Sequence, residues 1–523
     1  MNKENKHYCD VLIVGSGIAG LSAALTIAEE GLNVIVVTKQ QSIEESNTFY
    51  AQGGIVSRGI DDSPDILIED IMQAGDGISN LEAVKIVAHE GPELVENFLI
   101  KKIGVPFTRS PENEFVFARE GGHSRRRILY CMDSTGKAIE ESLVGKLKEQ
   151  KNIKVLGNYT AIDLLTIPHH STSPLALYRE PQCIGAYVLN NMSEEVEKIF
   201  SSYTVLATGG LGRIYQHTTN PLGATGDGFA MADRAGARLI NMEYIQFHPT
   251  TLFHKDADGF LISEAVRGEG AKLKTKDNVP FMEKYSSSGD LAPRDEVCRA
   301  MYEEMLRRGD SYVYLDVASY TDINIKKRFP MIYKKCLSLD IDIQKVPIPV
   351  VPSAHYSCGG IQVDTWGMTS LKNLYAAGEV AATGLHGANR LASTSLLEGL
   401  IWGIRAARHI AGHFQDKKPY KESEIPPWRS PEQEEDVDPA LIQQDWVSIK
   451  STMWNYVGII RTVRRLERAL ADLNYLKDRI DNFYRRVHLV PMVINLRNGA
   501  RTARIVAEFA FKNRISRGAH FVR

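Results

Sequence analysis

The chain has 523 residues, of which 43% are hydrophobic and 24% are charged, and this composition excludes disordered and collagen-like chains. At roughly 150 residues per domain, the length predicts about three domains. The 62 basic residues almost cancel the 64 acidic ones, so the net charge provides no general attraction to nucleic acid or to an anionic membrane.

The first predicted elements are a strand, a tight turn, a helix and a second strand. Val11 to Val14 and Val34 to Val37 are continuous apolar runs, and Leu21, Leu25 and Ala28 lie between them at helical spacing. Continuous apolar runs are typical of parallel strands that are covered on both faces. The order therefore predicts a βαβ unit and an α/β fold.

The turn after the first strand carries Gly15, Gly17 and Gly20 in the pattern GxGxxG. Gly15 permits a tight turn, Gly17 lets a pyrophosphate group approach the backbone, and Gly20 lets helix and strand pack closely. The N-terminus of the helix can then hold the phosphate charge. An acidic residue that grips an adenosine ribose is missing, because the second strand ends Val37-Thr38-Lys39. The glycine pattern predicts a dinucleotide site, and the missing acidic residue weakens the case for NAD.

Two later segments resemble further strands of the same sheet, and each runs into a glycine turn. They are Tyr203 to Ala207 before GGLG and Asn373 to Ala377 before GE. FAD is long enough to contact several loops of one sheet. These turns, together with Gly226-Asp227-Gly228 and Ser395-Leu396, therefore favour FAD as the cofactor.

The rest of the chain divides by composition. Residues 246–350 combine charge-rich helical segments with a proline-punctuated stretch, and residues 416–439 are polar, acidic and rich in proline. Helical periodicity runs from Trp446 to Leu476 and from Pro491 to Lys512. We expect a Rossmann-like FAD-binding domain (1–245 and 351–415), an inserted α+β capping domain (246–350), a linker (416–439) and a C-terminal helical domain (440–523).

Basic residues concentrate at the C-terminal end, where residues 461–523 hold 15 Lys and Arg against 5 Asp and Glu. Helical spacing relates two groups of them, Arg461, Arg464, Arg465 and Arg468 and then Arg497, Arg501 and Arg504. Aromatic interleaving and a nucleic-acid-binding motif are absent, so we expect no nucleic acid partner. The open interpretations are a solvated helix face, docking on the acidic remainder of the chain, and attraction of an anionic substrate.

Cysteine usage and the N-terminal sequence bear on the compartment. The six cysteines are scattered and form no CxxC pair, which is typical of reduced thiols in a cytoplasmic protein. The first apolar run, Val11 to Val14, is too short for the core of a signal peptide or for a membrane span. We expect a cytoplasmic protein without disulfides, membrane contact or a metal site.

Seven segments then occur in a recognisable order: TFYAQGGI (48–55), REGGHSRRRIL (119–129), QFHPT (246–250), SEAVRGEGA (263–271), LAPRD (291–295), AHYSCGGI (354–361) and GLHGANRLASTSLLE (384–398). From about Asp10 to the C-terminus, the chain resembles the fumarate reductase and succinate dehydrogenase flavoprotein family, and most closely those members that oxidise L-aspartate. The resemblance implies FAD contacts from Gly15, Ser16, Gly17, Ile18, Ala19, Gly20, Lys39, Asn47, Thr48, Phe49, Tyr50, Ala51, Gln52, Gly53, Gly54, Ala161, Ile162, Gly209, Asp227, Glu379, Ser395 and Leu396.

The same motifs supply a binding set for a C4 dicarboxylate. Such a substrate needs cations or donors at both ends, and Arg is the side chain best shaped for bidentate contact with a carboxylate. The candidates are Arg390, His355, His248, Ser263 and, from the resemblance, Gln246. Ser263 departs from the Thr of the better-known relatives but retains the hydroxyl group.

Two positions distinguish members of the family. Asn47 stands where the respiratory enzymes have a histidine that carries covalent FAD, so we expect FAD to be bound non-covalently. Glu120 would repel a plain dicarboxylate but attract an α-ammonium group, which would select aspartate over succinate. The alternative for Glu120 is a surface carboxylate paired with Arg119 or Arg125.

The reaction that the resemblance implies is hydride transfer from Cα of L-aspartate to flavin N5, which gives iminoaspartate. O2 or fumarate would reoxidise the flavin, and the product would pass to quinolinate synthase in NAD biosynthesis. The family assigns proton donation or acceptance to the arginine that matches Arg294. A free guanidinium titrates above about 12 and is a poor base, so we expect Arg294 to act as an acid in fumarate reduction and mainly to stabilise charge in aspartate oxidation.

Two alternatives remain open. One is a soluble fumarate reductase or succinate dehydrogenase flavoprotein, in which Glu120 would be incidental. The other is a non-catalytic flavin-binding protein, which would require a broken carboxylate-binding set.

Overall fold

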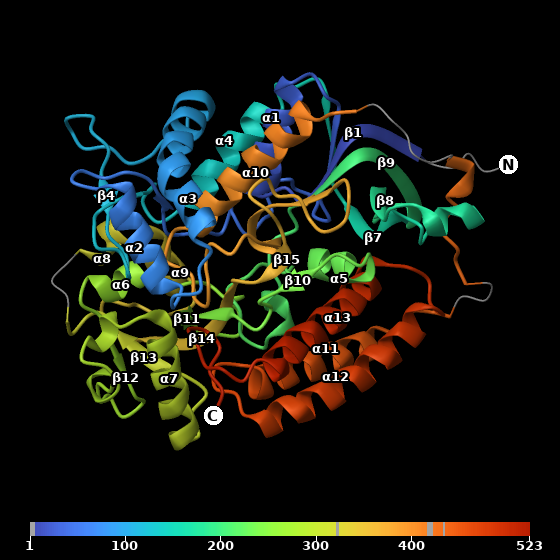
Figure 1. The fold of residues 1–523 in the computed structure, drawn as a ribbon. Helices are drawn as coiled ribbons and strands as arrows, with labels where there is room; N and C mark the ends of the chain where they lie inside the picture. The colour runs from blue at the N-terminus through green and yellow to red at the C-terminus, as the bar shows by residue number, and fades with distance from the viewer. Residues whose placement is uncertain (1–5, 321–323, 416–421, 432–434) are drawn as a thin grey trace.

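A computed structural model describes residues 6–320, 324–415, 422–431 and 435–523. It contains a seven-stranded mixed sheet, a separate four-stranded antiparallel sheet and a group of helices at the C-terminal end (Figure 1). This confirms the predicted α/β fold with its C-terminal helices. All six cysteines are free thiols.

The βαβ unit predicted from the N-terminal sequence is present. Strand β1 (Lys6–Val14) pairs in parallel with β2 (Val34–Val37), helix α1 (Ile18–Glu29) connects them, and β6 (Ile153–Leu156) extends the sheet beyond β2. The predicted second strand coincides with β2, and the run from Val11 to Val14 is the carboxyl half of β1. Both runs are buried, as expected of parallel strands covered on both faces.

Strand β9 (Glu195–Leu206) joins the parallel and antiparallel parts of the large sheet. It pairs in parallel with β1 and with β16 (Leu374–Ala376), and antiparallel with β8 (Gln182–Asn190), which continues to β7 (Tyr159–Ile167). The sequence predicts only the carboxyl end of β9, because polar residues interrupt its first part, which pairs with β8.

The carboxyl ends of β1, β9 and β16 meet at one edge of the sheet. Each strand is followed by a turn that contains a glycine with positive φ: Gly15 (116°), Gly209 (72°) and Gly378 (73°). L-residues rarely adopt such φ values. The three glycine turns predicted from the sequence are therefore neighbours in space.

The second sheet has the order β11-β14-β13-β12. Its strands are β11 (Ile245–Leu252), β12 (Lys272–Lys274), β13 (Val313–Asp316) and β14 (Ile348–Ser357). Helices α6 (Glu264–Gly268), α7 (Arg294–Arg308), α8 (Ile325–Arg328) and α9 (Pro330–Leu337) accompany it. The other strands and α-helices that precede the C-terminal helices are β3 (Ile55–Val56), α2 (Pro64–Ala74), α3 (Leu81–Leu94), β4 (Phe117–Ala118), β5 (Ile128–Leu129), α4 (Thr135–Leu147), α5 (Asp227–Arg234), β10 (Leu239–Ile240), β15 (Gly360–Gln362), β17 (Ala381–Ala382) and α10 (Ser395–Gly412), and α3 continues into a π-helix (Val95–Ile103).

Three long helices form the C-terminal part, α11 (Pro439–Tyr456), α12 (Val463–Tyr484) and α13 (Pro491–Lys512). The predicted helix from Pro491 coincides with α13. The periodicity from Trp446 to Leu476 spans two helices rather than one, because Thr462 caps the N-terminus of α12 by accepting the Arg465 N–H at 3.2 Å.

The predicted linker is only partly within the described residues, since 416–421 and 432–434 lie outside them. In the described part, Ile425 is buried and Trp428 packs edge-on against Tyr187, with 5.4 Å between ring centroids. This part of the segment is therefore packed against the large sheet.

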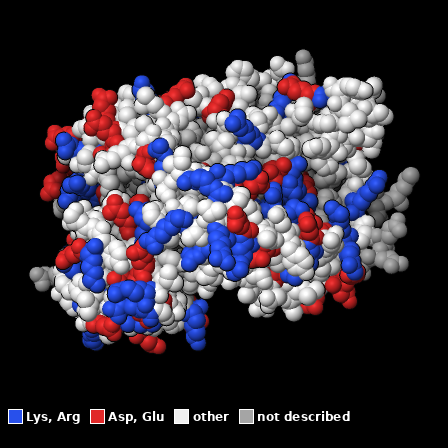
Figure 2. Space-filling model, turned by 60° about the horizontal axis from the view of Figure 1, so that its bottom comes forward, with Lys and Arg blue, Asp and Glu red and all other residues white. Residues whose placement is uncertain are grey.

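The basic residues of the C-terminal helices divide into two kinds. Arg497 pairs with Asp163 at 3.0 Å and Arg501 pairs with Asp233 at 2.5 Å, whereas Arg464 is exposed. Figure 2 shows Lys and Arg gathered on the face that carries these helices, with acidic side chains among them. Docking on the rest of the chain and a solvated face therefore both account for the local charge.

A stability prediction concerns Arg461, which lies in the chain between α11 and α12 and whose side chain is fully buried. Its guanidinium donates to the carbonyl oxygens of Gly458 at 3.0 Å and Glu243 at 2.8 Å. Arg461→Met would remove both donors, leaving the Glu243 oxygen with only the Ile245 N–H at 3.1 Å, so we expect a loss of about 3 kcal/mol in unfolding free energy. Chemical denaturation measures this loss. Arg464→Met is the matched control and should stay within about 0.5 kcal/mol of the parent protein; equal losses in the two variants would contradict the prediction.

Candidate active site

A large cavity lies at the sheet edge where β1, β9 and β16 end. It encloses about 1820 Å³ of empty space, part of which is open to solvent. Residues of the three glycine turns line it, among them Gly15, Gly209 and Gly378. Ligands of open α/β sheets bind at the carboxyl ends of the strands, so this position marks the cavity as a ligand site.

The GxGxxG turn forms one wall. A Cβ atom at Gly15 would lie 2.1 Å from the Ala207 carbonyl oxygen, and one at Gly20 would lie 2.1 Å from the Gly15 carbonyl oxygen. Gly17 precedes α1 with extended backbone and places no side chain at its N-terminus, where the Ile18 N–H donates to Thr48 Oγ1 at 3.0 Å. Gly15 and Gly20 therefore allow the tight turn and the close packing, and Gly17 lets an anionic group approach the positive end of α1 at the cavity wall.

Lys39 and Asp227 also line the cavity and bind each other. Lys39 Nζ donates to Asp227 Oδ2 at 2.5 Å and to Thr225 Oγ1 at 2.9 Å. An acidic side chain from the N-terminus of α5 therefore lies on the cavity wall beside the end of β2.

Asn47 and Glu379 form a second pair on the wall. Asn47 Nδ2 donates to Glu379 Oε2 at 3.1 Å, and the Ser357 N–H donates to Oε1 at 3.0 Å. Burial raises the pKa of Glu379 to about 7 although both hydrogen bonds lower it. Near neutral pH this carboxyl group can therefore either donate or accept a hydrogen bond.

Arg390 is buried at the cavity with part of its guanidinium unpaired. Nη1 donates to Ser395 Oγ at 3.3 Å, and the guanidinium lies over the Tyr356 ring, 4.8 Å from its centroid. Among the described residues, Nε has no hydrogen-bond partner. A buried unpaired guanidinium N–H is suited to a carboxylate ligand.

Two histidines stand beside this arginine, with 5.2 Å between the ring centroids of His248 and His355. The Thr250 N–H donates to His248 Nδ1 at 3.2 Å, and Thr219 Oγ1 lies 2.8 Å from His355 Nδ1. Burial, together with the nearby arginines, holds both pKa values well below the usual value. Both rings are therefore neutral near pH 7, and His248 offers its Nε2–H as a donor.

Arg294 begins α7 and is fixed by two partners. Its Nε donates to Glu264 Oε2 at 2.6 Å and its Nη1 donates to Gln246 Oε1 at 3.3 Å. Burial would raise the pKa of Glu264, but Arg294 and Arg267 outweigh it and lower that pKa to about 2. Glu264 is therefore an anion that stabilises the positive charge of Arg294.

Glu120 faces the cavity rather than bulk solvent. Ser393 Oγ donates to its Oε2 at 2.7 Å, and a Cβ atom at Gly53 would lie 3.1 Å from its Oε1. Burial raises the pKa of Glu120, and the neighbouring Glu264 adds to this effect. Arg119 instead donates to the His123 carbonyl oxygen and Arg125 to that of Asp61, so the interpretation as a paired surface carboxylate is wrong.

Most of the predicted site residues reach the cavity wall, and four do not. The wall contains Gly15, Ser16, Gly17, Ile18, Ala19, Lys39, Asn47, Thr48, Tyr50, Ala51, Gln52, Gly53, Gly54, Glu120, Ala161, Gly209, Asp227, His248, Ser263, Arg294, His355, Glu379, Arg390, Ser395 and Leu396. Ser263 Oγ also caps α6 by accepting the Ala265 N–H at 3.3 Å.

The four others lie behind the wall for distinct reasons. Gly20 packs on the Gly15 carbonyl, and Phe49 packs edge-on against Tyr50. Ile162 lies where the β7–β8 register shifts between Ala161 and Asp163, and its side chain is buried in a hydrophobic cluster. Gln246 donates to the Arg390 carbonyl oxygen at 2.8 Å, so it orients the arginines from behind.

Sequence reasoning missed several residues that hold the site together. Glu264, Tyr356 and Ser393 lie inside the recognised motifs, and a search for partners of each buried arginine and carboxylate there would have found them. Thr219 lies in none of these motifs. Its contact with His355 arises only from the fold.

The donors of the cavity fit a flavin dinucleotide. The N-terminus of α1 suits its pyrophosphate. Among the described residues, Gln52 Oε1, Thr208 Oγ1 and Arg390 Nε are buried on the wall without hydrogen-bond partners, so a bound group can satisfy them. Within the residues that the structure describes, no group of three or more His, Cys, Asp or Glu side chains is arranged to hold a metal ion.

Comparison with known proteins agrees with this assignment. The family described as FAD binding domain matches residues 10–396. The chain is 44% identical to an L-aspartate oxidase of Yersinia pestis over 100% of this chain and 97% of that protein. It is 42% identical to an L-aspartate oxidase of Acinetobacter baylyi over 99% and 94% of the two chains. Its fold matches the FrdA chain of E. coli quinol fumarate reductase with a TM-score of 0.87 and 27% identity, covering 99% of this chain and 92% of that one. Within the described residues, no helix is both long and apolar enough to cross a membrane.

Proposed function

The chain belongs to the L-aspartate oxidase family of FAD-dependent flavoproteins, and from this premise we propose how its residues carry out the reaction. The activity is FAD-dependent oxidation of L-aspartate to iminoaspartate, the first step of NAD biosynthesis through quinolinate. The observation that carries the assignment of roles is the placement of the Glu120 carboxylate on the same wall as Arg294 and Arg390. A carboxylate among cations suits a substrate with both carboxylate and ammonium groups.

The residues that hold FAD are those of the sheet edge. The N-terminus of α1 binds the pyrophosphate, and Lys39, Asp227, Asn47 and Glu379 hold the polar groups along the wall. When bound, FAD supplies the acceptor for the hydride that leaves Cα.

The substrate is held at both ends. Arg390, His248 and His355 bind carboxylate oxygens as a cation and two neutral donors, with the Ser263 hydroxyl beside them. Glu120 binds the α-ammonium group and accepts one of its protons, because hydride loss requires the nitrogen lone pair. Its raised pKa brings this carboxylate closer to the value that suits a general base near neutral pH.

Arg294 stabilises charge during oxidation. Its guanidinium donates to the Glu264 carboxylate, and a guanidinium is a poor base near neutral pH, so the proposed role is proton donation when fumarate is reduced. Gln246 orients Arg294 and the Arg390 backbone together.

The wider setting belongs to the same proposal. Fumarate or O2 accepts the electrons, quinolinate synthase consumes the iminoaspartate, and the protein works in the cytoplasm. Residues 1–245 and 351–415 act as the FAD-binding domain, 246–350 as the capping domain over the substrate, 416–439 as the linker and 440–523 as the helical domain. Strand β14 runs through the boundary at 350, which ties the capping domain to the FAD-binding domain.

Anaerobic mixing of the FAD-loaded protein with L-aspartate, and separately with succinate, tests the proposal. We expect L-aspartate to bleach the visible flavin absorbance and succinate to leave it unchanged. Bleaching by succinate alone would transfer the chain to the succinate dehydrogenase type of activity, and no bleaching by either would leave a flavoprotein with another substrate.

Release of the flavin by acid is a separate expected result. Asn47 has no nucleophilic group for a covalent flavin bond, and its amide donates to Glu379. Acid precipitation should leave all the yellow colour in the supernatant. Flavin absorbance retained in the washed pellet would contradict non-covalent binding.

A further inference from the structure

The C-terminal helix α13 reaches the wall of the cofactor cavity, although none of the recognised motifs includes it. Lys39 Nζ lies 3.3 Å from Asn495 Oδ1, and Asn498 Nδ2 donates to Asp227 Oδ1 at 2.9 Å. Both wall residues of this pair are therefore held from behind by amide groups of α13.

The two contacts complete the hydrogen bonding of the pair. Asp227 Oδ2 accepts a hydrogen bond from Lys39 Nζ. Asp227 Oδ1 accepts from Thr225 Oγ1 at 3.0 Å and from Asn498. Asn498 is fully buried. Without Asn498, Asp227 Oδ1 would keep only the Thr225 hydroxyl as a donor, so the carboxylate would be held less firmly at the cavity.

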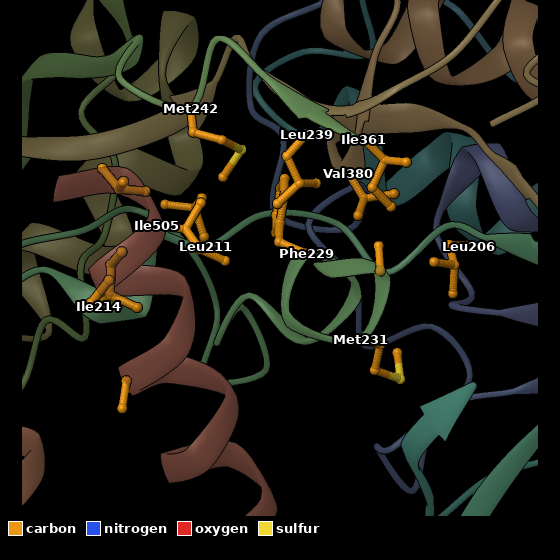
Figure 3. Close-up of a cluster of buried hydrophobic side chains, with 14 of the residues drawn as sticks. Leu206, Leu211, Ile214, Phe229, Met231, Leu239, Met242, Ile361, Val380 and Ile505 are labelled. Carbon is orange, nitrogen blue, oxygen red and sulfur yellow. The ribbon is translucent and has the colours of Figure 1, made fainter. Parts of the chain in front are cut away.

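Helix α13 is anchored firmly enough to position these groups. Thr502 Oγ1 donates to the Gly226 carbonyl oxygen at 3.0 Å, next to Asp227. Figure 3 shows Ile505 of α13 packed in the same buried cluster as Phe229 of α5 and Leu211. The ion pairs of Arg497 and Arg501 with the body of the chain act on the same helix. Figure 1 shows α13 lying alongside α5.

We propose that α13 is a positioning element of the FAD site, and that Asn495 and Asn498 set FAD affinity by fixing Lys39 and Asp227. Because coupling between two equilibria is reciprocal, FAD binding also strengthens the docking of α13 on α5. The C-terminal helical part then has a function in cofactor retention. The inference concerns FAD affinity and does not depend on which substrate is oxidised.

Titration of the full-length apoprotein with FAD, followed by flavin fluorescence, tests whether Asn495 and Asn498 set the affinity for FAD. A hydrogen bond to a charged group contributes enough that Asn498→Ala should raise the Kd for FAD about 10-fold. Asn513→Ala is the matched control, because Asn513 ends the same helix and donates to Glu243 at 2.8 Å and to Tyr244 at 3.2 Å, away from the cavity. An equal rise in both variants, or none in Asn498→Ala, would overturn the proposal.

A second pair of variants covers the case in which Asn498→Ala does not fold. Asn495 is only partly buried, and Asn495→Asp keeps an oxygen acceptor for Lys39 whereas Asn495→Ala does not. We expect Asn495→Asp to retain the Kd of the parent protein for FAD. Asn495→Ala should raise this Kd several-fold. Equal Kd values in the two variants would contradict the positioning role.

Hydrogen exchange tests whether FAD binding strengthens the docking of α13 on α5. Addition of FAD to the apoprotein should slow amide exchange in α13 as well as in the turn that carries Gly15. Slowing confined to that turn would show that α13 is not coupled to the cofactor. Failure of L-aspartate to bleach the flavin would leave these binding results intact, so the two proposals fail separately.

Discussion

Arg294→Leu is expected to lower fumarate reduction about 1000-fold while L-aspartate oxidation falls by no more than about 10-fold. Reduction of fumarate needs a proton delivered to carbon, and Arg294 is the partly buried cation that Glu264 and Gln246 fix at the cavity. In the proposed oxidation, Arg294 stabilises charge but transfers no proton, so its loss should cost less there. In this variant, the Glu264 carboxylate still lies 3.9 Å from the Arg267 guanidinium. The substitution therefore does not leave an isolated anion.

The measurement is kcat with fumarate and a reduced dye, set against kcat with L-aspartate and O2. Arg299→Leu is the control, because Arg299 lies on the same helix α7 but pairs with Asp295 at 2.8 Å and does not line the cavity. Equal loss of both activities in Arg294→Leu would mean that Arg294 carries the proton in both directions, against the division of roles proposed above.

Glu120→Gln is expected to lower kcat/KM for L-aspartate about 100-fold and to raise that for succinate. The substitution keeps the shape and the contact with Ser393 but removes the charge that binds the α-ammonium group, and hydrogen bonds between charged groups are among the strongest in proteins. It also removes the repulsion of a plain dicarboxylate. Comparison of kcat/KM for the two substrates gives the selectivity directly, and an unchanged ratio would remove Glu120 from substrate recognition.

The pH profile checks the same residue independently. Burial raises the pKa of Glu120 and the Ser393 hydroxyl lowers it, so kcat/KM for L-aspartate should fall with acid at a pH above the usual carboxyl range. Ser393→Ala removes the lowering contact and should move this acidic limb to higher pH. Glu120→Gln should abolish the limb, and a limb that persists in this variant must arise from another group.

Local signals determined the parts of this protein that a few consecutive residues specify. The runs of four apolar residues in β1 and β2 and the glycine pattern between them predicted the βαβ unit, because each depends only on residues close together in the chain. The periodicity from Pro491 to Lys512 predicted α13 for the same reason. The order of the seven motifs indicated the FAD enzyme family. Most of the site residues predicted from these motifs line one cavity.

Only the tertiary structure decided how those residues are paired. Glu120 and its donor Ser393 are 273 residues apart, and Lys39 and Asn495 are 456 residues apart. No local propensity specifies such contacts, since they follow from the path of the chain through the sheets. The pKa shifts of Glu120 and Glu379 depend on burial and on neighbouring charges. These quantities exist only in the folded chain, and they distinguish a pattern of residue types from the site that we propose to bind aspartate and accept its proton.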